Sequence, residues 1–219
     1  MPINFNISVS QPRRLFDPSS IGDPVASQTQ WVPLKRGGKN YRSHKIRMPN
    51  SSRLEFRVSI SAFLFYSIVV LIGLALMGSA SVNTLPAGGY AFRVRDVTLF
   101  VAGVVVAVLG ACLVYSGTAP IVFDKRQGYF WKGKKAPRVL SASMPLKNVA
   151  KLDDIHALQL ISEYIMGTRS HDHYSFELNL VLKDGKRINV VDHGDLTRMR
   201  ADVATLSAFL GKPIWDLAS

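Results

Sequence analysis

Two long stretches of this 219-residue chain contain no charged side chain, and they constrain its structure more than any other feature. Their apolar cores are residues 58–80 and 97–117. A helix rises about 1.5 Å per residue, so each core can cross the roughly 30 Å of hydrocarbon in a bilayer. Backbone groups in lipid must be hydrogen-bonded within their own segment. We therefore predict a hairpin of two transmembrane helices, joined by an external loop at 81–96, in preference to two buried helices of a soluble protein.

The distribution of charge predicts how this hairpin is oriented. The net charge is +12, and residues 1–57 carry 10 basic and 3 acidic side chains, while 116–152 carry 8 basic and 1 acidic. The connecting loop has only two basic residues. Lysine and arginine stay on the cytoplasmic side of a membrane, so both termini are expected in the cytoplasm. Residues 153–219 are slightly acidic, so the basic charge reflects topology, and no nucleic-acid partner is predicted.

Small residues line one side of the second hydrophobic stretch. Gly103, Ala107 and Ala111 recur at four-residue spacing, which lets another helix approach closely. We expect this ridge to pack on the first helix of the same chain, and the alternative is a contact with a second copy in a homodimer or with another membrane protein. Cys112 is the only cysteine, so the chain has neither an internal disulfide nor a cysteine-based metal site.

The segments before the spans differ from one another in composition. Residues 1–40 are rich in Pro, Ser, Gly, Asn and Gln without a sustained period, and we interpret them as a largely irregular or loosely attached segment. Residues 41–57 have the pattern of a strand, a turn and a second strand that runs directly into the first span. We expect the strand at 53–58 to lie beside a strand at 120–124, so that the transmembrane hairpin interrupts a β-domain.

The region at 118–219 predicts an α+β cytoplasmic domain. Short alternating runs, of which 174–182 is the clearest, indicate an antiparallel β-sheet or barrel. A C-terminal amphipathic helix at 195–210 closes it, capped by Asp195 and ended by Gly211.

The last hairpin of this domain can be read for register. A three-residue loop ending at Gly185 places Leu180 opposite Ile188 and Leu178 opposite Val190, with apolar residues on the same face. A two-residue turn would oppose apolar to polar side chains, because a slip of one residue exchanges the two faces of a strand. We therefore predict the longer loop, with Gly185 in the left-handed conformation.

The sequences IVFDKRQGYFWKG, ALQLISE, FELNLVLKDGKRINVVDHG and FLGKPIWD carry this pattern of short strands followed by a helix. Together with the two spans, they resemble the bacterial membrane-anchored pleckstrin-homology-like proteins. The resemblance covers 118–219 and implies a pleckstrin-homology-like fold at the bacterial inner membrane. It includes no catalytic or ligand signature, so it assigns a role to no residue here.

The histidines are the first candidates for a metal or catalytic site. His171 and His173 lie two residues apart, and His193 can join them only if the fold brings it there. A zinc site needs three or four ligands in fixed geometry, and a lone pair of histidines in a polar loop is usually solvated. The chain also lacks a GxSxG nucleophile motif and a glycine-rich phosphate loop. We therefore expect no cofactor and no enzymatic activity, with a metal-dependent hydrolase as the alternative.

A basic and aromatic segment directly after the second span is the best candidate for a binding surface. Such residues suit the surface of an anionic membrane leaflet, where each Lys or Arg gains about 1 kcal/mol. The proposed headgroup-binding set is Lys125, Arg126, Trp131, Lys132, Lys134, Lys135 and Arg138.

These features together predict a non-enzymatic inner-membrane protein. Its cytoplasmic pleckstrin-homology-like domain would act as a scaffold or regulatory interaction module for protein or lipid. An accessory subunit of a larger membrane complex is a further alternative.

Overall fold

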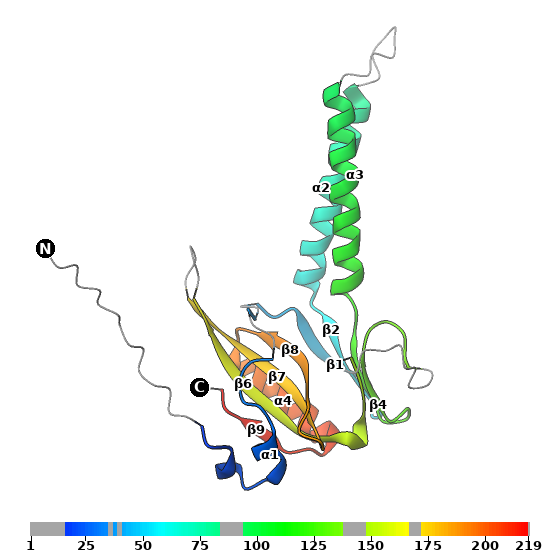
Figure 1. The fold of residues 1–219 in the computed structure, drawn as a ribbon. Coiled ribbons are helices and arrows are strands. Elements are labelled where there is room, and N and C mark those ends of the chain that lie inside the picture. The colour runs from blue at the N-terminus through cyan, green and yellow to red at the C-terminus, as the bar shows by residue number, and fades with distance from the viewer. Residues whose placement is uncertain are drawn as a thin grey trace, which may run out of the picture.

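A hairpin of two long helices stands on an α+β domain in the computed structural model of the protein (Figure 1). The structure describes residues 16–34, 37–38, 41–83, 94–137, 148–166 and 172–218. The helices are η1 (Pro18–Ile21), α1 (Pro24–Gln28), α2 (Ile60–Asn83), α3 (Val94–Gly117), η3 (Leu152–Asp154) and α4 (Leu196–Leu210). The strands are β1 (His44–Asn50), β2 (Arg53–Val58), β3 (Ile121–Asp124), β4 (Tyr129–Lys132), β5 (Val149–Lys151), β6 (Ile155–Ile165), β7 (His173–Leu182), β8 (Arg187–His193) and β9 (Ile214–Asp216).

The strands form two separate sheets. Sheet A has the order β1-β2-β3-β4-β5 and is antiparallel throughout. Sheet B has the order β8-β7-β6-β9, and β9 is parallel to β6 because the chain returns through α4 before it. The turn η3 carries the chain from one sheet to the other. Within the described residues no ladder joins the sheets into a closed barrel, so of the predicted sheet or barrel only the sheet form is observed.

One hydrophobic core is shared by both sheets and α4. Phe123 contributes to it from sheet A, Leu178 from sheet B and Leu206 from α4, and all three side chains are fully buried. Burying a side chain of this size contributes about 1.5–3 kcal/mol. The helix α4 packs on sheet B, against β6, β7 and β9. The two sheets therefore belong to one domain.

The helical hairpin interrupts sheet A, as the sequence predicted. The strand before it, β2, and the strand after it, β3, are antiparallel neighbours, with Phe56 opposite Ile121. The chain leaves sheet A at the end of β2, runs up α2 and down α3, and re-enters the sheet beside its point of departure (Figure 1). The helices are joined to the domain at two adjacent points.

The predicted ends of α4 are confirmed. The side chain of Asp195 accepts a hydrogen bond from the backbone amide of Arg198 at 2.9 Å, which satisfies a free donor of the first turn. Gly211 ends the helix with φ +67°, a left-handed conformation that glycine adopts without a steric cost. Gly185 has φ +76° in the loop between β7 and β8, also as predicted.

The register of β7 and β8 follows the prediction at one end only. Leu180 lies opposite Ile188, as expected for the three-residue loop. Leu178, however, lies opposite Val191 instead of Val190, because the register shifts between Leu178 and Asn179. Such a bulge adds one residue to one strand, and local periodicity does not reveal it.

The described part of the N-terminal segment is packed against sheet B, so of the two alternatives, irregular or loosely attached, the second does not hold for residues 16–34. Trp31 lies 5.6 Å from the ring of Trp215 in β9. The carboxylate of Asp23 lies 2.7 Å from Nε2 of His156 in β6. Figure 1 shows this segment in blue beside β6 and β9. Sheet B is therefore covered on both faces, by α4 on one and by this segment on the other.

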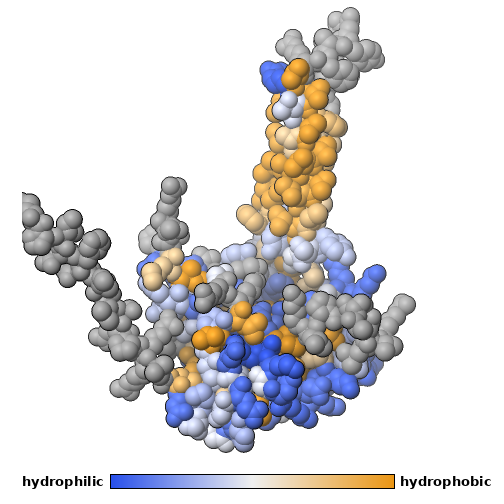
Figure 2. Space-filling model, in the orientation of Figure 1, coloured by the Kyte–Doolittle hydropathy of each residue, from blue (hydrophilic) through white to orange (hydrophobic). Residues whose placement is uncertain are grey.

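The two long helices bury little of their surface. Both are long and apolar enough to cross a membrane, over Ile60–Ala80 and Val94–Gly117. Only 17% and 11%, respectively, of their most apolar stretches are buried. Figure 2 shows them as a column with a hydrophobic surface that rises from a largely hydrophilic domain.

Candidate functional site

The hairpin base, which we define as Ser59 and residues 117–120, joins the helices to sheet A. Ser59 alone separates β2 from α2, and its backbone amide donates to the carbonyl of Ser43 at 2.8 Å. Its hydroxyl accepts from the amide of Ala62 at 3.3 Å and so caps the first turn of α2. On the other side, the backbone amide of Thr118 donates a hydrogen bond to the carbonyl of Val114 in α3. The bond to Ser43 ties the start of α2 to the segment that precedes β1.

The structure divides the predicted headgroup-binding set between the two ends of sheet A. Lys134 lies at the hairpin base, since its Nζ is 4.0 Å from the ring centroid of Tyr115 in the last turns of α3. Lys125 lies at the opposite end, where its amide donates to Ser52 in the β1–β2 turn and its Nζ is 4.6 Å from the ring of Phe209. Arg126 follows in the same distal turn.

Lys132 and Lys135 lie toward the hairpin base, and Arg138 lies outside the described residues. Nζ of Lys132 is 3.3 Å from Oδ1 of Asn189 in β8, so this ammonium bridges the two sheets. Lys135 is exposed. A four-residue strand spans about 13 Å, which is the separation between the two groups of basic residues along sheet A.

Trp131 is buried and cannot reach a headgroup, which corrects its predicted role. Its side chain is 1% exposed and packs with Val122 and Val149 on the outer face of sheet A. The guanidinium of Arg53 lies 5.5 Å from its ring. Its neighbour Phe130 points into the main core, because successive side chains of a strand face opposite ways.

Sequence reasoning missed two basic residues of the same surface. Lys45 and Arg57 lie opposite each other in the β1–β2 ladder, directly below the start of α2. The one available signal was that Arg57 is the last charge before the first apolar stretch. Arg57 and Arg47 also line an open depression with Met48 and Pro49 at this edge of sheet A.

A buried carboxylate organises the arginines around it. Glu55 accepts hydrogen bonds from Arg53 at 2.6 Å and Arg57 at 2.5 Å, while Arg53 also lies 3.4 Å from Asp124. Burial is the largest influence on Glu55 and disfavours its charged form. The bonds from Arg57 and Arg53 together outweigh it and hold the pKa of Glu55 below its usual value. The carboxylate is therefore ionised and fixes the direction of both guanidinium groups.

The predicted histidine site does not come together. His193 lies opposite Phe176, three residues along β7 from His173, which is about 10 Å in a strand. His171 lies outside the described residues. Among the residues with described placement, no three metal-ligating side chains form a cluster.

His193 is instead a neutral, buried side chain. It is 2% exposed, and Nδ1 accepts a hydrogen bond from the amide of Asp195 at 3.2 Å. Nε2 then carries the proton, and it has no hydrogen-bond partner among the described residues. Burial first, and then the positive charge of Arg42, lower the pKa of His193 to about 4.

Arg42 links α4 to the hairpin base. Its guanidinium is 2.6 Å from the carboxylate of Asp202 in α4, and both side chains are largely buried. The carbonyl of Arg42 accepts a hydrogen bond from the hydroxyl of Ser59 at 3.3 Å. Burial raises the pKa of Asp202, and Arg42 opposes that effect.

The small residues of α3 pack within the hairpin itself. A side chain at Gly103 would place its Cβ 2.7 Å from Cγ of Met77 and 2.8 Å from the carbonyl oxygen of Gly73. Gly73 in turn lies against the backbone of Ala107. Ala111, the third residue of the predicted ridge, is exposed. Gly103 and Ala107 are therefore occupied by α2, and only Ala111 remains open to another helix.

No protein-family model matches this chain, and no curated protein matches it significantly. What remains to indicate a function is the geometry of the chain itself. It consists of a junction between an apolar hairpin and an α+β domain, with Lys45, Arg57, Lys134 and Lys135 around the junction.

Proposed function

We propose that the chain is a non-enzymatic inner-membrane protein with two spans and cytoplasmic ends. Its α+β domain would be a pleckstrin-homology-like module that acts as a scaffold or regulatory interaction unit against the leaflet. The observation that carries the proposal is the apolar hairpin, exposed on most sides, which grows out of two adjacent strands of sheet A.

The exposure of α2 and α3 supports insertion in a bilayer. A core helix of a soluble protein is mostly buried, whereas Leu71 and Val108 are more than half exposed in the middle of these helices. Water strongly disfavours so large a contiguous apolar surface. Hydrocarbon around the hairpin removes this cost, and the helices satisfy their own backbone hydrogen bonds.

The pleckstrin-homology-like interpretation is supported in its general features. The domain has two mainly antiparallel sheets and a C-terminal helix that packs on sheet B. The junction at Ser59 holds this domain at one distance from the proposed leaflet. A module placed in this way can present a fixed face to partners at the membrane surface.

The basic residues at the hairpin base support cytoplasmic orientation and contact with anionic headgroups. Lys45, Arg57, Lys134 and Lys135 surround the ends of the helices. Each such charge gains about 1 kcal/mol near an anionic leaflet, provided that it lies within a Debye length of the surface. The depression between Arg47 and Arg57 offers a place for a phosphate group.

Membrane topology is the first test. The full chain, tagged at either end, should resist extraction by alkaline carbonate. Both tags should be digested by protease in inverted vesicles and protected in right-side-out vesicles. Extraction of the chain by carbonate, or tags on opposite sides, would contradict the proposal.

Lipid selectivity is the second test. The protein purified in mild detergent should retain more anionic lipid than the bulk membrane contains. Neutralising the four residues at the base (Lys45, Arg57, Lys134 and Lys135, each to Gln) should remove most of this enrichment. The control Lys125→Gln/Arg126→Gln changes charges at the distal end of sheet A and should leave it unchanged. An equal loss per charge removed in both variants would show that net charge alone matters.

The non-enzymatic part of the proposal is supported by the separation of His173 from His193. Metal analysis of the purified chain tests it directly, and we expect no stoichiometric metal. One zinc ion per chain, lost on His171→Ala/His173→Ala, would favour the hydrolase alternative.

A further inference from the structure

The hairpin of β6 and β7 ends in large side chains that are exposed in part or for the most part. Tyr164 is 39% exposed, Tyr174 49% and Met166 81%. Tyr164 and Tyr174 lie opposite each other in the ladder, with ring centroids 5.1 Å apart. We refer to these three residues as the β6–β7 end. Together they form a small amphipathic patch that carries phenol groups and a thioether.

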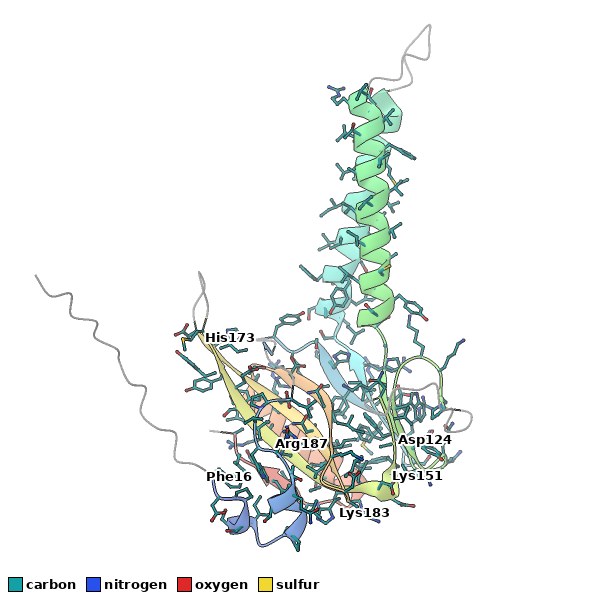
Figure 3. The ribbon with its side chains drawn as sticks, in the orientation of Figure 1. Phe16, Asp124, Lys151, His173, Lys183 and Arg187 are labelled. Atoms are coloured by element: carbon teal, nitrogen blue, oxygen red, sulfur yellow. The ribbon has the colours of Figure 1, made fainter. Side chains whose placement is uncertain are left out.

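The β6–β7 end lies on the side of the domain from which the helices rise. Figure 3 labels His173, the first residue of β7, near the level at which α2 begins and α3 ends. Lys183, just after the other end of β7, lies at the far side of the domain. Figure 1 shows β6 and β7 pointing toward the side of the domain from which the helices rise, to the left of the helices in this view.

Chain connectivity places the β6–β7 end near α2 independently of the view. The amide of Gly38 donates to Glu163 at 3.3 Å, and Gly38 lies so close to Ser175 that a side chain there would collide with it. Three residues later, Tyr41 is hydrogen-bonded to Tyr66 of α2. Three residues span at most about 11 Å. The upper part of the β6–β7 hairpin is therefore within reach of the first two turns of α2.

Tyrosines gather at this level of the molecule. Tyr41 and Tyr66 lie on one side of the hairpin base, and Tyr115 lies in the last turns of α3. With Tyr164 and Tyr174, they make five of the seven tyrosines in the chain. Tyrosine is enriched where membrane meets water, because its ring is apolar and its hydroxyl is hydrated.

We propose that the β6–β7 end is a second membrane contact, with Tyr164, Met166 and Tyr174 in the headgroup layer. This inference rests on the proposed function, since it requires α2 and α3 to span the bilayer. The domain then touches the leaflet at the hairpin base and at the β6–β7 end. With two contacts, the tilt of the domain is fixed more firmly than by the hairpin base alone.

Neighbouring acidic groups are arranged so that they do not oppose this contact. The carboxylate of Asp172 accepts a hydrogen bond from the hydroxyl of Tyr164 at 2.5 Å. Glu163 accepts from the amides of Gly37 and Gly38. The hydrogen bonds that these carboxylates accept partly compensate the cost of removing them from water. In the hydrated headgroup layer, they also keep contact with water. The surface is too small to be a stable protein interface, which needs about 800 Å² from each partner.

Site-directed fluorescence in vesicles tests the proposal. The full chain with Cys112→Ser as background receives one cysteine for an environment-sensitive label, at Met166, Lys183 or Leu71. Each variant is reconstituted into phosphatidylcholine vesicles with a minor fraction of phosphatidylglycerol. Quenching by a lipid with a nitroxide on its headgroup is compared with quenching by iodide in the water. Because all three sites are exposed, the labels need not disturb folding.

We expect the Met166 label to be quenched several-fold more by the headgroup nitroxide than the Lys183 label, and less by iodide. Equal iodide quenching at both sites would overturn the proposal. Protection of Met166 from both quenchers would also overturn it, since a protein surface would then cover the patch. The Leu71 label distinguishes failure of this inference from failure of the proposed membrane hairpin. If it is shielded from iodide while Met166 is not, only this inference fails, whereas exposure of Leu71 to iodide refutes the membrane hairpin itself.

Discussion

Replacing the buried histidine of β8 should remove most of the acid sensitivity of the folded domain between pH 7 and pH 5. His193 has a pKa of about 4 because it is buried and faces the positive charge of Arg42. The other charged groups around it are Asp192, Asp195 and Arg198, of which the two carboxylates partly oppose that effect. In the unfolded chain the same imidazole has a pKa of about 6.5.

The sign follows from the order of these two pKa values. As the pH falls below about 6.5, the imidazole of His193 binds a proton in the unfolded chain. In the folded chain it does so only near pH 4. The stability contributed by neutral His193 is therefore complete above this window and is lost progressively within it. At about 1.4 kcal/mol per pH unit, the loss by pH 5 is about 2 kcal/mol. Glu55, with a pKa below its usual value, still contributes its full stability at about pH 5 and loses it only at lower pH.

His193→Asn tests this reasoning, because its amide oxygen can still accept the hydrogen bond from Asp195. The Tm of the detergent-solubilised chain should fall between pH 7.5 and pH 5.0 by about 4 °C more in the wild type than in this variant. His173→Asn is the matched control, and it should keep the wild-type pH dependence. If the wild type and His193→Asn lose the same amount, the histidine is not the acid-sensitive group and the reasoning is refuted.

Three further perturbations follow from contacts in the structure. Gly103→Leu should force α2 and α3 apart at a cost of about 1–3 kcal/mol in a helicity titration with denaturing detergent, whereas Ala111→Leu, on the exposed side, should cost almost nothing. Arg42→Met should cost about 3 kcal/mol in denaturant unfolding because it leaves Asp202 buried without its partner, and adding Asp202→Leu should restore most of that loss. Trp131→Ala should lower the denaturant midpoint by the equivalent of about 3–5 kcal/mol, and a small effect would mean that the side chain is at the surface after all.

The parts of the fold that were predicted correctly are those encoded by neighbouring residues. A run without charge marks most of each long helix, although α2 continues to Asn83 and α3 already begins at Val94, inside the predicted loop. Asp195 and Gly211 mark the ends of α4, because a helix satisfies its backbone groups locally. The length of the three-residue loop before β8 could also be predicted, since the loop had to bring Leu180 opposite Ile188. The short strands β5 and β9 were missed, because three residues are too few to show a period.

The candidate site was only partly predictable, for a reason that Lys125 and Lys134 illustrate. They lie nine residues apart in one basic segment, yet β3 and β4 are antiparallel. Lys125 therefore lies in the turn far from the helical hairpin, and Lys134 lies after β4, which returns to it. Lys45 is far from both in sequence and still lies at the hairpin base, because β1 pairs with β2. Proximity to the base depends on strand order, which composition does not encode.

The apolar hairpin, the α+β character of the rest and the insertion of the hairpin between adjacent strands were visible in the amino-acid pattern. The burial of Trp131, the packing of residues 16–34 on sheet B and the distance of His193 from His173 became clear from the folded chain. Helix and strand periods follow from bonds and contacts between near neighbours, and those are visible along the chain. Which distant faces meet is decided by the summed packing of the core, in which many small contacts between remote segments must be satisfied together.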